Sequence, residues 1–66
     1  MAKYYVNNKA QANGEHEVHV STCLFMPMSA KYLGDFTHCA DAVRAAKAVY
    51  PQTNGCYLCS KECHTG

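Results

Sequence analysis

The sequence has almost no excess of charge of either sign. Six lysines and arginines stand against five aspartates and glutamates, which leaves a formal net charge of +1. Nonspecific binding to nucleic acid or to anionic lipid depends on a strongly basic surface, so this balance does not predict a polyanion as the partner. The sequence does not identify a partner, but it favours a protein over nucleic acid.

Long apolar runs are also missing. No stretch is long enough to cross a bilayer, and the start of the chain, residues 1–4, leads into no apolar signal region. We therefore expect no membrane association and a cytoplasmic location. In that reducing compartment, clustered cysteines are more often metal ligands or redox groups than stable disulfides. The cysteine count of five points the same way, because a fully paired disulfide framework needs an even number.

The chain is short, at 66 residues, and no linker or low-complexity tract divides it. We therefore expect one domain spanning residues 1–66. A hydrophobic core of this size contributes only about 3–5 kcal/mol of net stability, so a disulfide, a structural metal or a partner chain is expected to add to it. Such a chain has little scope for both a shielded cleft and a binding surface, and the sequence therefore predicts no enzyme.

The N-terminal part of the chain predicts a hairpin. Residues 3–7 favour a pleated strand, and Asn13-Gly14 supplies a turn before a second strand at residues 15–21. Alternation along the second strand places Val18 and Val20 on its inner face and His19 on the other face. Residues 32–36 could form a short third strand or a tight turn.

An alanine-rich stretch predicts one helix. Thr37 can cap it, and the helix is expected to continue for about three turns to Tyr50, where Pro51 ends it. Cys39 lies on the same stripe as other apolar residues, which favours a role in core packing. The chain from residue 52 onward is expected to form turns. The predicted fold class is α+β: a two- or three-stranded antiparallel sheet, one packed helix and a C-terminal CxxC turn.

The strongest chemical signal is the pair Cys56-x-x-Cys59. A two-residue spacer in a tight turn allows both sulfurs to bind one ion at about 2.3 Å. His19 and Cys23 could supply the other half of a tetrahedral site, provided that the chain turns after Val20, because in a straight strand they would lie about 13 Å apart. Four protein ligands leave no place for water, which is typical of structural zinc. The sequence therefore predicts a structural zinc site with the ligands His19, Cys23, Cys56 and Cys59.

The remaining histidines and cysteines have simpler expected roles. We expect His16 to be satisfied by a backbone carbonyl and His38 to be exposed. Cys63 and His64 could replace one of the proposed ligands, or Cys63 could pair with a cysteine of the CxxC turn. A frayed C-terminal tail is the favoured interpretation, because chain ends are commonly poorly ordered.

Two other functions stay open beside a zinc-stabilised binding or accessory module. The CxxC pair could act as a thiol–disulfide redox group, although the sequence shows no strand leading into it and no helix starting from it. The protein could also be a metal-free interaction module that docks through an apolar segment, although so small a core is expected to need those side chains inside. The residues of this segment are Leu24, Phe25, Met26 and Met28.

Two resemblances rest on these motifs. The order His-x-x-x-Cys, an apolar segment, an alanine-rich helix and Gly-Cys-x-x-Cys, over residues 19–59, resembles the small zinc modules of the Ada DNA-repair protein type. This chain has Gly55 where that pattern has proline. Nearly the whole chain resembles a family of short bacterial proteins without an assigned function. The shared motifs are Tyr4-Tyr5-Val6-Asn7, Asn13-Gly14-x-His16-Glu17-Val18-His19, Leu33-Gly34-x-Phe36, Tyr50-Pro51, Asn54-Gly55-Cys56-x-x-Cys59 and Glu62-Cys63-His64.

Overall fold

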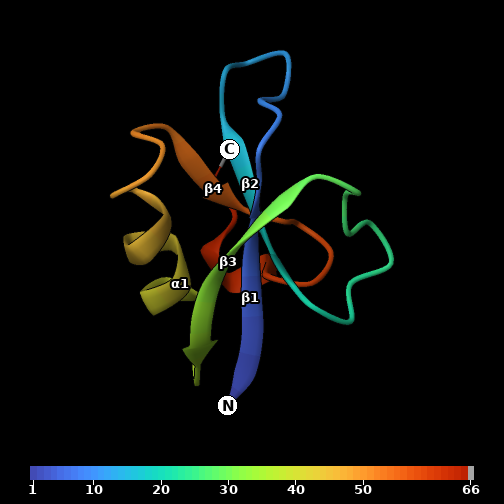
Figure 1. Cartoon of the computed structure of the whole chain (residues 1–66), viewed down its shortest axis with the longest axis vertical. Coiled ribbons are helices and arrows are strands. Elements are labelled where there is room, and N and C mark those ends of the chain that lie inside the picture. The colour runs from blue at the N-terminus through green and yellow to red at the C-terminus, as the bar shows by residue number, and fades with distance from the viewer. Residues whose placement is uncertain (66) are drawn as a thin grey trace.

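The N-terminal hairpin is formed as predicted. In the computed structural model, which describes residues 1–65, strand β1 (Ala2–Asn7) pairs antiparallel with strand β2 (His16–Val20). Gly14 lies in the connecting loop with a φ of 87°, a conformation that glycine adopts readily. The hairpin supplies the two central strands of the sheet, as Figure 1 shows.

Two further strands flank the hairpin. Strand β3 (Ala30–Phe36) pairs antiparallel with β1, so the third strand is present. Strand β4 (Thr53–Gly55) pairs parallel with β2, which gives the strand order β3-β1-β2-β4 (Figure 1). The α+β class with a packed helix is confirmed, but the sheet is mixed rather than purely antiparallel. The prediction missed β4 because three residues are too few to show strand alternation.

The helix is shorter than predicted. Helix α1 runs from Cys39 to Ala46, and its N-cap is His38 rather than Thr37. The backbone N–H of Ala40 donates to Nδ1 of His38 at 3.0 Å, so an imidazole replaces the hydroxyl acceptor that we expected. Neither α1 nor any other helix within residues 1–65 is long and apolar enough to cross a membrane.

The residue just before Pro51 is held by tertiary contacts. Residues 47–49 form turns, and Tyr50 lies outside the helix against the hairpin loop. Its ring stacks on His16 with 3.7 Å between the ring centroids, and its hydroxyl donates to Asn8 at 2.8 Å. These contacts fix the chain between the end of α1 and Pro51.

The main core lies between the sheet and α1. Val6 and Val18 are fully buried and pack with Ala42 and Ala46 of the helix. His19 follows Val18 in the strand and therefore points to the opposite face, yet only 1% of it is exposed. Strand β2 is thus buried on both faces.

The apolar segment at residues 24–28 does not belong to this core. It is a loop, as predicted, but Leu24 and Met28 are almost entirely exposed and Phe25 is more than half exposed. The expectation that these side chains pack inside is wrong for Leu24, Phe25 and Met28, whereas Met26 is partly buried. The core is already filled by the valines of the hairpin and by the alanines of α1.

The substitution Val18→Ala tests whether the buried Val18 contributes more to stability than an exposed valine. We expect it to lower the free energy of unfolding by about 1–3 kcal/mol, because it removes buried methyl groups and leaves a cavity. Val49→Ala is the matched control at an exposed position and should change the stability by less than about 0.5 kcal/mol. Urea denaturation measures both values. Equal losses in the two variants would contradict the described core.

Candidate metal centre

A tight turn follows β2 and returns the chain toward His19. The backbone N–H of Cys23 donates to the carbonyl of Val20 at 2.9 Å, which closes a turn over residues 21 and 22. His19 and Cys23 can bind one ion only if the chain turns at this place, and the structure contains the turn. Cys23 is buried beside the strand that carries His19.

The CxxC turn reaches the same place from the other end of the chain. It follows β4 directly, and the backbone N–H of Cys56 continues the strand pairing by donating to the carbonyl of Val18 at 3.0 Å. The N–H of Ser60 then donates to the carbonyl of Cys56 at 2.8 Å, which closes the turn. The parallel pairing of β4 with β2 therefore sets the position of both cysteines of the CxxC turn.

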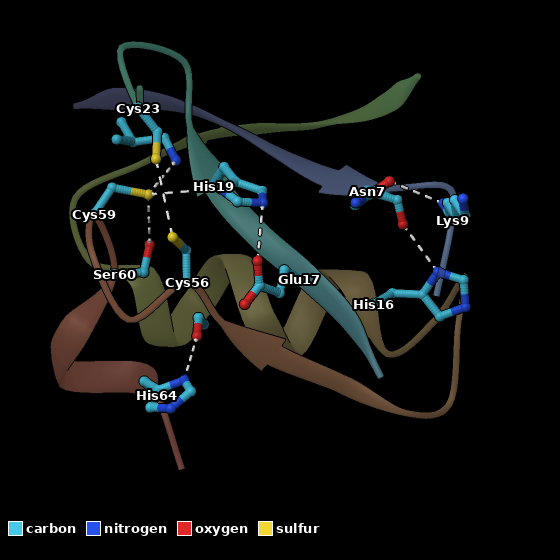
Figure 2. A network of polar contacts seen from close by, with 12 residues as sticks. Asn7, Lys9, His16, Glu17, His19, Cys23, Cys56, Cys59, Ser60 and His64 are labelled. Carbon is cyan, nitrogen blue, oxygen red and sulfur yellow. Dashed lines mark hydrogen bonds and ion pairs between the residues drawn. The ribbon is translucent and has the colours of Figure 1, made fainter. Parts of the chain in front are cut away.

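The structure brings together all four residues proposed as ligands. One donor atom from each of His19, Cys23, Cys56 and Cys59 lies within 4.8 Å of the others (Figure 2). The sulfurs of Cys23 and Cys56 are 3.9 Å apart, and the sulfur of Cys59 lies 4.0 Å from Nδ1 of His19. Zinc–sulfur bonds of about 2.3 Å in a tetrahedron place neighbouring sulfurs about 3.8 Å apart. The cluster, called the Cys3His cluster below, is compact enough to hold one metal ion.

Polar neighbours orient two members of the Cys3His cluster. Nδ1 of His19 faces the cysteines, whereas Nε2 lies 3.4 Å from a carboxylate oxygen of Glu17 (Figure 2). A carboxylate on the second ring nitrogen is the usual partner of a metal-binding histidine. The backbone N–H of Val20 donates to the sulfur of Cys59 at 3.4 Å, which favours negative charge on that sulfur.

Glu17 was not predicted as part of the site. The available signal was its position two residues before His19, which places both side chains on the same face of a strand. That spacing alone does not separate a carboxylate that orients a ligand from one that faces solvent. The CxxC turn covers this face of the strand, and this cover holds the Glu17 carboxylate beside His19 and away from solvent.

Burial controls the protonation of the cluster. Desolvation lowers the pKa of His19 more strongly than the nearby Glu17 carboxylate raises it, so the imidazole is neutral at pH 7 and Nδ1 can offer a lone pair. Desolvation, followed by the contact with Cys59, raises the pKa of the Cys23 thiol. In the metal-free protein this thiol is protonated, and binding of a metal ion would displace its proton.

The remaining two cysteines form a disulfide. Cys39, the first residue of α1, is bonded to Cys63, the last residue of the 3₁₀ helix η1 (Lys61–Cys63). Cys39 is buried in the core as expected, but it is bonded there and not free. The expectation of a frayed tail at Cys63 is wrong. A bond between these two was not among the alternatives, because their positions depend on how η1 packs against α1. An odd number of cysteines means only that they cannot all be paired within one chain, so a single disulfide is compatible with it.

His64 is also held rather than frayed. Its Nδ1 is hydrogen-bonded to the carbonyl of Gly55 at 3.0 Å (Figure 2). The backbone N–H of Thr65 donates to the side chain of Asn54 at 2.9 Å, which anchors the next residue to β4 as well. Neither His64 nor Cys63 takes the place of a ligand in the Cys3His cluster.

The expectations for the other two histidines are confirmed. Nδ1 of His16 is hydrogen-bonded to the backbone carbonyl of Asn7 at 2.9 Å (Figure 2). The side chain of His38 is half exposed.

The comparisons with known proteins found no matching family model, no matching curated protein and no matching solved structure. The family resemblances of the motifs therefore stay predictions, and the interpretation of the site depends on its own geometry.

Counting thiols tests the arrangement of the cysteines. In denaturant with a chelator and without reductant, we expect three reactive thiols per chain, from Cys23, Cys56 and Cys59. After reduction the count should rise to five, because the bond between Cys39 and Cys63 is opened. A thiol-specific chromogenic reagent measures both values. A count of five without reductant would contradict the disulfide.

Proposed function

We propose that this protein is a small zinc-stabilised module that acts as a binding or accessory protein rather than as an enzyme. The observation that supports this proposal is the convergence of one imidazole and three sulfurs within 4.8 Å of one another. The four donors come from two segments separated by more than thirty residues, 19–23 and 56–59. Their meeting is a property of the fold and not of a local motif.

The donor set favours zinc over other common ions. Magnesium and calcium prefer carboxylate, carbonyl and water oxygens, and the Cys3His cluster offers none as a direct ligand. Three sulfurs and one nitrogen in a compact arrangement are typical of tetrahedral zinc. We therefore assign His19, Cys23, Cys56 and Cys59 as the ligands.

The cluster supports a structural role for the ion. Four protein ligands complete a tetrahedral shell, so no position is left for a water or a substrate. Three of the four residues are buried, and Cys59 is partly buried. The ion would hold the turn after β2 against the CxxC turn, and its binding free energy would contribute directly to folding.

The CxxC turn itself gives less support to the redox alternative. Reactive CxxC cysteines commonly lie at a helix N-terminus, where the thiolate is stabilised. Here Cys56 follows a strand, and the next helical element is η1, which contains only three residues. The two sulfurs are instead directed toward His19 and Cys23 (Figure 2).

The exposed apolar side chains support a binding role with a protein partner. Phe25 and its neighbours follow the ligand Cys23, and Tyr57 and Leu58 lie between the two cysteines of the CxxC turn. The rings of Phe25 and Tyr57 have centroids 6.3 Å apart, so the two loops present their apolar groups together. Uncharged apolar surface of this kind suits a protein better than a nucleic acid. A bound ion would hold the loop after Cys23 and the CxxC turn in fixed positions, and so would stabilise the arrangement of these exposed side chains. The cytoplasmic location and the partner stay proposals.

Cys56→Ser tests the structural zinc site. The wild-type protein should bind one zinc per chain, and at free zinc about 1,000-fold above the dissociation constant the ion should add about 4 kcal/mol to the stability. The variant should lose both the zinc and this stabilisation, because one ligand is missing. Elemental analysis and thermal unfolding with and without a chelator measure the two effects.

Tyr57→Ser is the control for this experiment. Tyr57 lies in the same turn, but its side chain is exposed and is not a member of the cluster. It should bind zinc like the wild type. The proposal is refuted if the wild type binds no zinc, or if a chelator does not lower the unfolding temperature of the wild type.

Glu17→Gln tests the orienting carboxylate. We expect the affinity for zinc to fall by about 10-fold or more with the stoichiometry unchanged, because the carboxylate on Nε2 of His19 is lost. Glu15→Gln is the matched control, since the carboxylate of Glu15 contacts Asn13 and Asn54 instead. Competition with a chromogenic chelator measures the affinities. Equal affinities in the two variants would remove Glu17 from the site.

A further inference from the structure

A second group of residues that could hold a metal ion includes the disulfide. Besides Cys39 and Cys63 it contains His38, the N-cap of α1, and one donor atom from each of the three lies within 4.8 Å of the others. This group, called the disulfide cluster below, shares no residue with the Cys3His cluster. Its two sulfurs are held together by a covalent bond in place of an ion.

The histidines of the two clusters have the same pattern of neighbours. In the Cys3His cluster Nδ1 of His19 lies 4.0 Å from a cysteine sulfur, and Nε2 lies 3.4 Å from Glu17. In the disulfide cluster Nδ1 of His38 lies 3.9 Å from the sulfur of Cys39, and Nε2 lies 3.6 Å from a carboxylate oxygen of Glu62. An imidazole placed between sulfur and carboxylate is the arrangement of a metal-binding histidine with its orienting partner.

From this correspondence we propose that reduction of the Cys39–Cys63 disulfide opens a second zinc site, with Cys39, Cys63 and His38 as ligands and Glu62 as the carboxylate that orients the imidazole. The reductant is a dithiol. It transfers two electrons and two protons to the disulfide, which becomes two thiols, and it is itself oxidised to a disulfide. Zinc then binds the two sulfurs as thiolates and releases their two protons to solvent.

The surroundings of the disulfide cluster suit an exchangeable site. His38 is half exposed, Glu62 is largely exposed and Cys63 is only partly buried. Cys39 is buried, so a small dithiol would attack the disulfide at the sulfur of Cys63. Three protein ligands leave the fourth position of a tetrahedral ion open to solvent. The Cys3His cluster differs in both respects, because it is mostly buried and complete. The second ion is therefore expected to bind more weakly and to exchange faster than the first.

Binding at this site changes the start of α1. Nδ1 of His38 accepts from the N–H of Ala40 in the disulfide form, and the same lone pair is needed for the ion. The ring must turn from the helix toward the sulfurs when zinc binds. The site therefore couples the oxidation state of the cysteines to the capping of the helix.

Native mass spectrometry tests the proposal, because it reports the disulfide and the number of zinc ions in one spectrum. The full chain is loaded with zinc in the disulfide form, or after reduction with a dithiol that is removed under anaerobic conditions. We expect one more zinc per chain in the reduced form than in the disulfide form. The proposal is overturned if reduction to five thiols adds no zinc.

Two variants locate the additional ion. His38→Ser keeps a side-chain oxygen that can cap α1 and keeps both cysteines, but it should weaken binding of the additional ion by more than about 10-fold. The double variant C39S/C63S should lack this ion under both conditions. Undiminished binding of the additional zinc in either variant would overturn the assignment.

Cys56→Ser separates this proposal from the zinc module proposed above. It removes a ligand of the Cys3His cluster and leaves the disulfide cluster intact. If both proposals hold, reduction raises the zinc count from one to two in the wild type and from none to one in this variant. If the Cys3His cluster binds no zinc, the wild type itself rises from none to one, and the second site is still supported.

Discussion

The structure depends on the pairing of the three-residue strand β4 with β2. This parallel pairing is short, but the hydrogen bond from the N–H of Cys56 to the carbonyl of Val18 extends it into the CxxC turn. Without it, the CxxC turn would not be aligned with the turn after β2. The pairing places the CxxC turn over His19, which buries that side chain and completes the Cys3His cluster.

The burial of β2 on both faces explains how so small a chain can contain a buried polar site. Val18 faces α1 and belongs to the hydrophobic core, whereas His19 faces the two loops that carry the cysteines. A sheet covered on one side only would leave one of these faces in water. Strand β2 therefore separates two buried regions, the hydrophobic core on one face and the Cys3His cluster on the other.

Local patterns predicted the parts of the fold that depend on local chemistry. The hairpin follows from alternation and from Asn13-Gly14, and the gathering of His19 with the CxxC pair follows from ligand spacing together with the need for a turn. What escaped prediction depends on tertiary contacts. The ring of Tyr50 stacks on His16 of the hairpin, beyond the end of the helix. Cys39 and Cys63 are close enough to bond because η1 packs against α1. Burial of the apolar loop was predicted from the small size of the chain, whereas the valines and alanines already fill the available space.

The disulfide and the Cys3His cluster interleave along the chain. Cys39 lies between the two halves of the cluster, and its partner Cys63 lies beyond both of them. The two closed loops therefore overlap, and neither is nested inside the other. A protease that cuts once between residues 40 and 55 leaves two fragments that are still covalently joined. An ion in the cluster would hold the same fragments together at a second point.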